Sequence, residues 1–169
     1  MASRRPGGEV GLLLGLIDEA YDRPAWHGPN LRGALRGLTA EAAAWRPAPE
    51  RHSIWEIVVH CAYWKYAVRR RLTGEGARGS FPRAGSNWPR LPAALDRAAW
   101  RADLELLDEE HRLLREAVAG FPARRLSERH GKHTAARLIR GIGAHDLYHA
   151  GQVRLLIKLA GAKAGRRPD

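Results

Sequence analysis

The sequence predicts an all-α protein, a four-helix bundle with a long crossover loop between the second and third long helices and a short extra helical segment. Three observations predict this fold. Apolar residues recur every three or four positions over four long stretches, which is the period of a helix that buries one face. Alanine and arginine are abundant and β-branched residues are scarce, a balance that favours helix over sheet. No stretch shows the alternation typical of a strand.

The first part of the chain predicts one long helix and two short helical segments. The long helix covers about 9–22 and ends before Pro24. A helical piece follows over 30–38, because Asn30 is a residue type that favours the N-cap position. A further short turn of helix is expected over 39–45, before Pro47.

The second long helix begins with a capping box. In the run Ser53-Ile-Trp-Glu56, the serine hydroxyl and the glutamate carboxylate can each bind a free backbone amide. The helix is expected to reach Leu72, because apolar residues continue at spacings of three and four to that point. A glycine- and proline-rich segment over 73–95 then predicts a loop of unusual length, which can cross the end of a bundle or shape the mouth of a pocket.

The third and fourth long helices each carry a seam that steps by four and three. Asp96 is the expected N-cap of the third helix, which Gly120 closes. Its seam is Trp100, Leu104, Leu107, His111, Leu114, Val118 and Phe121. The fourth helix is expected over 134–160, with Gly161 ending it before a basic tail.

Size and charge restrict the class of protein. The 169 residues predict a single domain over 1–169 with an ordered core of about 9–161. The chain carries 29 basic and 18 acidic residues, a net charge of +11, so nucleic acid is a conceivable partner. It is not favoured, because the charges are spread along the chain and no recognition helix or aromatic strand pattern accompanies them.

The same survey argues for a cytoplasmic protein. No apolar run approaches the ~20 residues that a membrane span requires. Arg4 and Arg5 followed by the apolar run 10–17 faintly imitate a signal peptide, but acidic residues follow at once and no cleavage site appears. One cysteine, Cys61, excludes an internal disulfide framework and a cysteine-rich zinc site.

Two histidines interrupt the seam of the fourth helix. His145 and His149 lie one turn apart, where leucines are expected. A buried imidazole without a partner costs roughly 1 to 3 kcal/mol, so two together suggest a bound cation. His60, beside the apolar stripe of the second helix, is the best third ligand, and Trp64 one turn away can exclude water. Three imidazoles leave a coordination position open, as catalytic metal sites do.

Several neighbouring residues are candidates for supporting roles. Asp146 and Gln152 can orient the ligands. His111 either lines the same cavity or is a core histidine with a local partner. The alternative to a metal site is that each histidine is simply hydrogen-bonded within the core, although this interpretation weakens for His145 and His149 taken together.

Three stretches and one helix resemble a known family. The stretches are 45–47 (WRP), 52–60 (HSIWEIVVH) and 145–152 (HDLYHAGQ), and the helix is the one that holds Trp100. Together they resemble the DinB superfamily of metal-binding bundles, and the resemblance covers nearly the whole chain. It implies a divalent metal, commonly zinc or nickel, bound by His60, His145 and His149. Some relatives place a glutamate at the position that matches His145.

The resemblance also implies what such a site does. Characterised relatives include thiol-dependent transferases and isomerases, and many others are assigned only as metal-dependent hydrolases. Dimers are frequent among them. The family name refers to DNA damage induction and does not by itself imply DNA binding.

Three further motifs have simpler explanations. His145-Asp-Leu-Tyr-His149 resembles the H-E-x-x-H protease motif, but aspartate replaces the glutamate and no downstream third ligand follows. The run 74–79 matches G-x-G-x-x-G, yet it follows a helix and not a strand, so we interpret it as loop. Cys61 lies on the apolar stripe, which favours a packing thiol over a nucleophile.

The sequence therefore predicts a metal-dependent enzyme that acts on a small-molecule substrate in a pocket near the long loop. The reaction is hydrolysis by a metal-bound water or transfer with a low-molecular-weight thiol bound to the metal. A homodimer is expected. The alternative is a noncatalytic binding protein whose basic surface engages nucleic acid and whose site is structural or vestigial.

Overall fold

The computed structural model describes residues 8–74 and 81–164. Its long helices are α1 (Gly8–Tyr21), α4 (Ile54–Thr73), α5 (Arg97–Ala119) and α6 (Ala135–Ala164). Between them lie the short helices α2 (Leu31–Ala34) and α3 (Ala40–Ala44), a 3-10 turn over Ala123–Arg125, and the strands β1 (Arg129–His130) and β2 (His133–Thr134).

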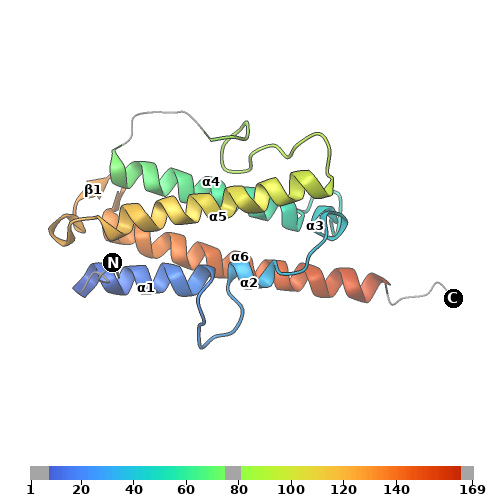
Figure 1. The fold of residues 1–169 in the computed structure, drawn as a ribbon, viewed down its shortest axis with the longest axis horizontal. Helices are drawn as coiled ribbons and strands as arrows, with labels where there is room; N and C mark the ends of the chain where they lie inside the picture. Colours follow the sequence, from blue (N-terminus) through green and yellow to red (C-terminus); the bar gives the residue numbers. More distant parts are fainter. Residues whose placement is uncertain (1–7, 75–80, 165–169) are drawn as a thin grey trace.

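The four long helices form a bundle in which each contacts two neighbours. α4 packs against α5 and α6, and α1 packs against α6 and α5. Figure 1 shows that α4 and α5 run in the same direction, so the connection between them must return along the length of the bundle. The prediction of an all-α bundle with a long crossover loop is confirmed.

The predicted helix starts are confirmed by their caps. Asn30 Oδ1 accepts a hydrogen bond from the Gly33 amide at 2.8 Å, and Asp96 caps α5 in the same way. At the start of α4, Ser53 Oγ accepts from the Glu56 amide at 3.2 Å while Glu56 Oε2 accepts from the Ser53 amide at 2.8 Å. This capping box fixes the residue at which α4 begins and therefore the position of His60 along the helix.

Two expectations about the last third of the chain are wrong. The absence of strands does not hold, because β1 and β2 pair as a short antiparallel hairpin with His130 opposite His133. Gly131 lies in its two-residue turn with φ 70°, which glycine adopts without a steric penalty. α6 also continues past Gly161 to Ala164, because a glycine inside a helix costs only about 1 kcal/mol and does not have to end it.

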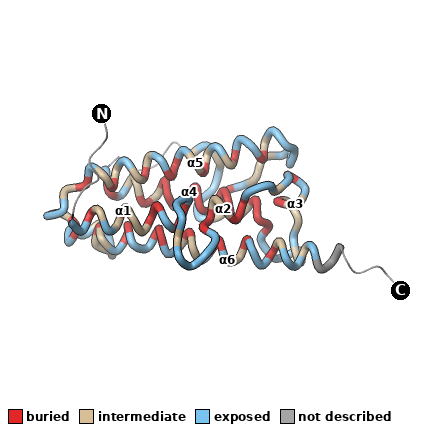
Figure 2. Tube along the Cα trace, turned by 60° about the horizontal axis from the view of Figure 1, so that its bottom comes forward, coloured by how far each residue is buried: buried red, intermediate tan, exposed pale blue. Residues whose placement is uncertain are grey.

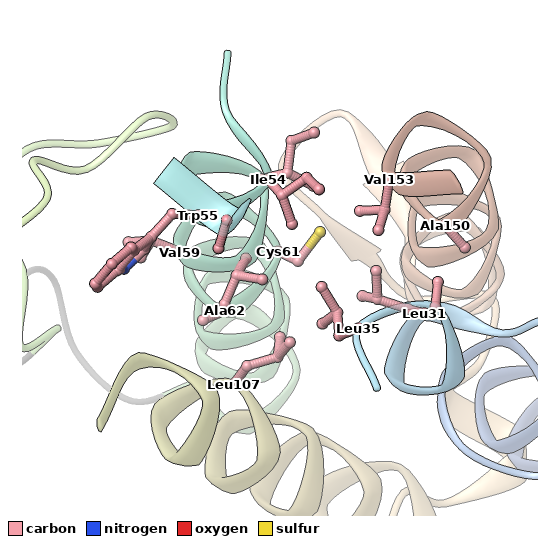
Figure 3. Close-up of a cluster of buried hydrophobic side chains, with 14 of the residues drawn as sticks. Leu31, Leu35, Ile54, Trp55, Val59, Cys61, Ala62, Leu107, Ala150 and Val153 are labelled. Atoms are coloured by element: carbon pink, nitrogen blue, oxygen red, sulfur yellow. The ribbon is translucent and has the colours of Figure 1, made fainter. Parts of the chain in front are cut away.

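The core lies between the long helices, as the buried segments in Figure 2 show. One cluster joins α2, α4, α5 and α6, and a second joins α1 to the other ends of α4, α5 and α6. Cys61 is fully buried in the first cluster, and Figure 3 shows its sulfur among side chains of α2 and α6. The interpretation of Cys61 as a packing thiol is confirmed.

Two sequence features fall mainly outside the described residues. Of the glycine-rich run 74–79, only Gly74 is described, and it caps the end of α4 with φ 72°. Arg4 and Arg5 lie outside as well. Among the helices of the described part, none has the length and apolar character to cross a membrane.

Candidate metal centre

Three histidines from two helices converge on one point. His60 comes from the middle of α4, and His145 and His149 come from successive turns of α6. The His145 Nε2 atom lies 3.0 Å from His60 Nε2 and 3.2 Å from His149 Nε2. One ligand nitrogen from each ring lies within 4.8 Å of the other two. The helical spacing therefore brings His145 and His149 together, and the packing of α4 on α6 adds His60.

Hydrogen bonds on the opposite side of two rings fix which nitrogen faces the centre. His60 Nδ1 donates to the backbone carbonyl of Asn87 at 2.6 Å. His149 Nδ1 donates to Gln152 Oε1, also at 2.6 Å. Because an acceptor holds the proton on Nδ1, the Nε2 lone pair is left free in both rings. This is the tautomer that a metal ligand requires, with the orienting partner that metal-ligating histidines usually have.

The rings are held in their neutral form. Burial lowers the pKa of His60 to about 4, although the hydrogen bond to Asn87 opposes the change. Burial, followed by the charges of His149 and His60, lowers the pKa of His145 to about 3. Burial also lowers the pKa of His149. Neutral imidazoles are the form that binds a cation, so the donors need not lose protons near pH 7.

The long loop supplies a lid residue that sequence reasoning did not single out. The Trp88 ring stacks on His60 with centroids 3.9 Å apart and on the far side stacks on His52 at 3.5 Å. The preceding residue, Asn87, has φ 61° and also accepts a hydrogen bond from Trp64 Nε1 at 2.9 Å. Trp64 and Trp88 therefore cover His60 from two directions and limit the access of water.

A pocket of about 900 Å³ opens beside the histidines, a size suited to a small molecule. The loop residues Asn87 and Trp88 form part of its wall, as expected from a loop near the pocket. Much of the remaining wall is apolar: Pro47, Ala48, Ile57, Leu155, Leu156 and Leu159. Arg51 and Gln152 add polar groups to this wall.

Asp146 faces away from this pocket. Its Oδ2 atom forms an ion pair with Lys65 of α4, and each side chain is only 1% exposed. Burial raises the pKa of Asp146, and the charge of Lys65 opposes this. The hydrogen bond of Asp146 thus goes to Lys65 and not to a candidate ligand. A buried, paired carboxylate outside the pocket cannot act as the base of an H-E-x-x-H protease.

His111 lies in the core, apart from the pocket that the three candidate ligands line. It is buried in α5, stacks on Tyr21 with ring centroids 3.8 Å apart, and has Nδ1 3.5 Å from Lys65 Nζ. It is not among the residues that line the pocket next to His149. Of the two interpretations given by the sequence, its surroundings match a core histidine with local partners.

A second group of potential ligands is chemically weaker. Cys61, His145 and Asp146 also place one donor atom each within 4.8 Å of the others. Burial raises the pKa of the Cys61 thiol well above its usual value, so the thiolate that binds metals is disfavoured. Asp146 is already paired with Lys65. The three-histidine group is therefore the better candidate.

One comparison with known proteins bears on this site. The family model described as the DinB superfamily matches residues 25–153, which is more than half of the chain and includes all three converging histidines. No curated protein and no solved structure matches the chain.

Proposed function

The chain belongs to the DinB superfamily, and from this premise we propose that it is a metal-dependent enzyme acting on a small molecule. His60, His145 and His149 would hold one divalent cation. The observation that carries the proposal is the convergence of three Nε2 atoms, two of them oriented by acceptors on the opposite ring nitrogen. His145 Nε2 lies 3.0 Å and 3.2 Å from the Nε2 atoms of His60 and His149, whose protons are on Nδ1. A single proton on His145 Nε2 can form a hydrogen bond to only one of these two lone pairs, whereas a cation can bind all three nitrogens.

The donor set fits a zinc or nickel ion. Imidazole nitrogen is a preferred ligand of both, and three protein ligands leave a position for substrate. A cation held there would supply Lewis acidity, which polarises a carbonyl or phosphoryl oxygen and acidifies a water or a thiol. If a water occupied the open position the reaction would be hydrolysis, and if a low-molecular-weight thiol occupied it the reaction would be a transfer.

The residues of the chain itself have separable roles in this proposal. Asn87 and Gln152 fix the orientation of the His60 and His149 rings through hydrogen bonds. Trp64 and Trp88 contact the His60 ring and would limit the access of water to it. The apolar wall contributed by Leu155 and its neighbours would bind a nonpolar part of the substrate. The homodimer predicted from the family resemblance stays a prediction.

Metal content of protein purified without a histidine tag tests the proposal. We expect about one zinc or nickel ion per chain in the parent protein, measured by elemental analysis after dialysis. His149→Ala should lower metal affinity more than the 10- to 100-fold typical of losing an orienting neighbour, because a ligand itself is lost. His27→Ala is the matched control, because His27 is exposed and distant from the three candidate ligands in sequence.

Circular dichroism would establish that each variant is folded before its metal content is interpreted. The proposal fails if His149→Ala retains the same stoichiometry and affinity as the parent and as His27→Ala. Equal loss in His27→Ala and His149→Ala would also contradict the assignment.

A further inference from the structure

A second pocket, of about 650 Å³, adjoins the candidate metal centre. It lies between α4, the β1–β2 hairpin and the first half of α6. Trp64 and His145 line both this pocket and the larger apolar one. A molecule bound in the second pocket would therefore lie next to one of the three converging histidines.

The described walls of this pocket carry positive charge. Arg71, Lys132, Arg137 and Arg140 line it, and none of the aspartates or glutamates that the structure describes does. None of these four forms an ion pair with a carboxylate in the described part of the chain. Other arginines of the molecule are neutralised, for instance Arg115, which binds Asp18 through two hydrogen bonds. An unneutralised cluster in a concave wall produces a positive potential that attracts anions.

Two histidines in the same wall have unsatisfied nitrogen atoms. His130 Nε2 and His133 Nδ1 are buried and lack a hydrogen-bond partner in the structure. Buried polar atoms are nearly always paired, so these two nitrogens retain unused hydrogen-bonding capacity within the protein. Both residues belong to the hairpin that closes one side of the pocket. The hairpin therefore adds two imidazole side chains to a wall whose charged residues are cationic.

We propose that this basic pocket binds the anionic group of the substrate, a phosphate or a carboxylate carried by a small organic molecule. The inference rests on the proposed function, because it places the anionic group beside the metal centre. Guanidinium groups bind both anions in a bidentate manner, and Arg137 and Arg140, one turn apart on α6, are the principal contacts. The neighbouring apolar pocket would take the nonpolar part of the same molecule.

A small molecule fits these features better than a nucleic acid does. The cations line a concavity of limited volume that ends at a candidate metal ligand, whereas a duplex is bound by an extended basic face that follows its phosphates. Nucleic-acid binding therefore enters as an outcome of the test.

The test measures binding of phenyl phosphate and benzoate by isothermal titration calorimetry at low salt. These probes share a ring and differ in the anionic group, so their relative affinities identify which anion the pocket prefers. We expect saturable binding of at least one probe at one site per chain. Arg137→Gln with Arg140→Gln should weaken it by about tenfold or more, because charge-assisted hydrogen bonds are lost.

The control is Arg97→Gln with Arg154→Gln, which removes the same charge from two exposed arginines outside the pocket. We expect it to change the affinity by less than about twofold, since neither arginine lines the pocket and neither can form a hydrogen bond to a probe bound there. An equal loss in both double variants, or no saturable binding of either probe, overturns the proposal. Binding of a 20-base-pair DNA duplex that depends on Arg137 and Arg140, without binding of the probes, also overturns it.

His149→Ala separates this inference from the metal assignment. The variant keeps every cation of the basic pocket, so probe binding should persist in it while metal is lost. If the parent protein holds no metal but binds the probes through Arg137 and Arg140, the metal-dependent function fails and the anion site stands. If the parent holds metal and neither probe binds, the anion site fails alone.

Discussion

Among single residues, His111 shows most clearly how the core controls ionisation. It contacts both Tyr21 and Lys65, and burial, followed by the positive charges of Lys65 and Arg115, lowers its pKa to about 2. In the unfolded chain the same ring has an ordinary pKa near 6.5. Below about pH 6.5, His111 is therefore protonated in the unfolded chain but stays neutral in the folded protein.

This difference predicts an acid-sensitive contribution to stability. Because the folded pKa is depressed, the contribution is complete above about pH 6.5 and is lost as the pH falls toward 2. Between pH 6 and 4 the free energy of unfolding of the parent should fall more steeply than that of His111→Gln, by up to about 1.4 kcal/mol per pH unit. Urea unfolding of both metal-free proteins at several pH values measures the two slopes. Parallel slopes would contradict the prediction.

The candidate ligands were predictable residue by residue, and their surroundings were not. His145 and His149 were paired by helical spacing alone, and His60 was placed near them by its position on a neighbouring amphipathic helix. Asn87 and Trp88 carry no such signal, because a loop has no periodicity from which direction can be inferred. Lys65 falls on the buried face of α4, and its partner Asp146 is 81 residues away in the sequence. That contact depends on how α4 and α6 pack.

At the level of elements, α4 depends on its first turn. Ser53 and Glu56 satisfy each other's backbone amides, and the helix they start carries His60. Ser53→Ala should reduce the free energy of unfolding by about 1 kcal/mol. For a chain of this length that corresponds to a fall of about 2 to 4 °C in Tm. Calorimetry would measure it, with Ser53→Thr as the control that retains the hydroxyl. A Tm for Ser53→Ala equal to that of the parent would show that packing alone sets this helix start.

The two elements that differ from the sequence prediction do so for separate physical reasons. Strands of two residues, as in β1 and β2, are too short to display an alternating pattern. Gly161 resembles a helix stop, but a terminal glycine lowers helix stability only modestly, and α6 continues past it. Local rules identify where helices begin far better than where they end, because the N-caps here use specific side-chain hydrogen bonds.

For the molecule as a whole, the Lys65–Asp146 pair joins α4 to α6 through the core. Removing one partner leaves a buried charge without compensation, which costs about 3 to 5 kcal/mol. Lys65→Met should therefore be strongly destabilising, and Lys65→Met with Asp146→Asn should recover part of the loss. Chemical denaturation of the parent, both single variants and the double variant gives the coupling energy. A double variant less stable than Lys65→Met would show that the pair is not coupled in this way.

The three converging histidines come from two helices, so the candidate metal centre forms only when these helices have packed together. His60 and His145 are 85 residues apart, and only the completed contact between α4 and α6 brings them together. A partly folded chain offers a cation no more than the two histidines of a single helix. An ion that binds only the complete site would thus stabilise the folded state. Its binding free energy would add to the free energy of unfolding and raise the resistance of the bundle to heat and denaturant. Removal of such an ion by a chelating agent would then lower the stability of the whole bundle as well as abolish the proposed activity.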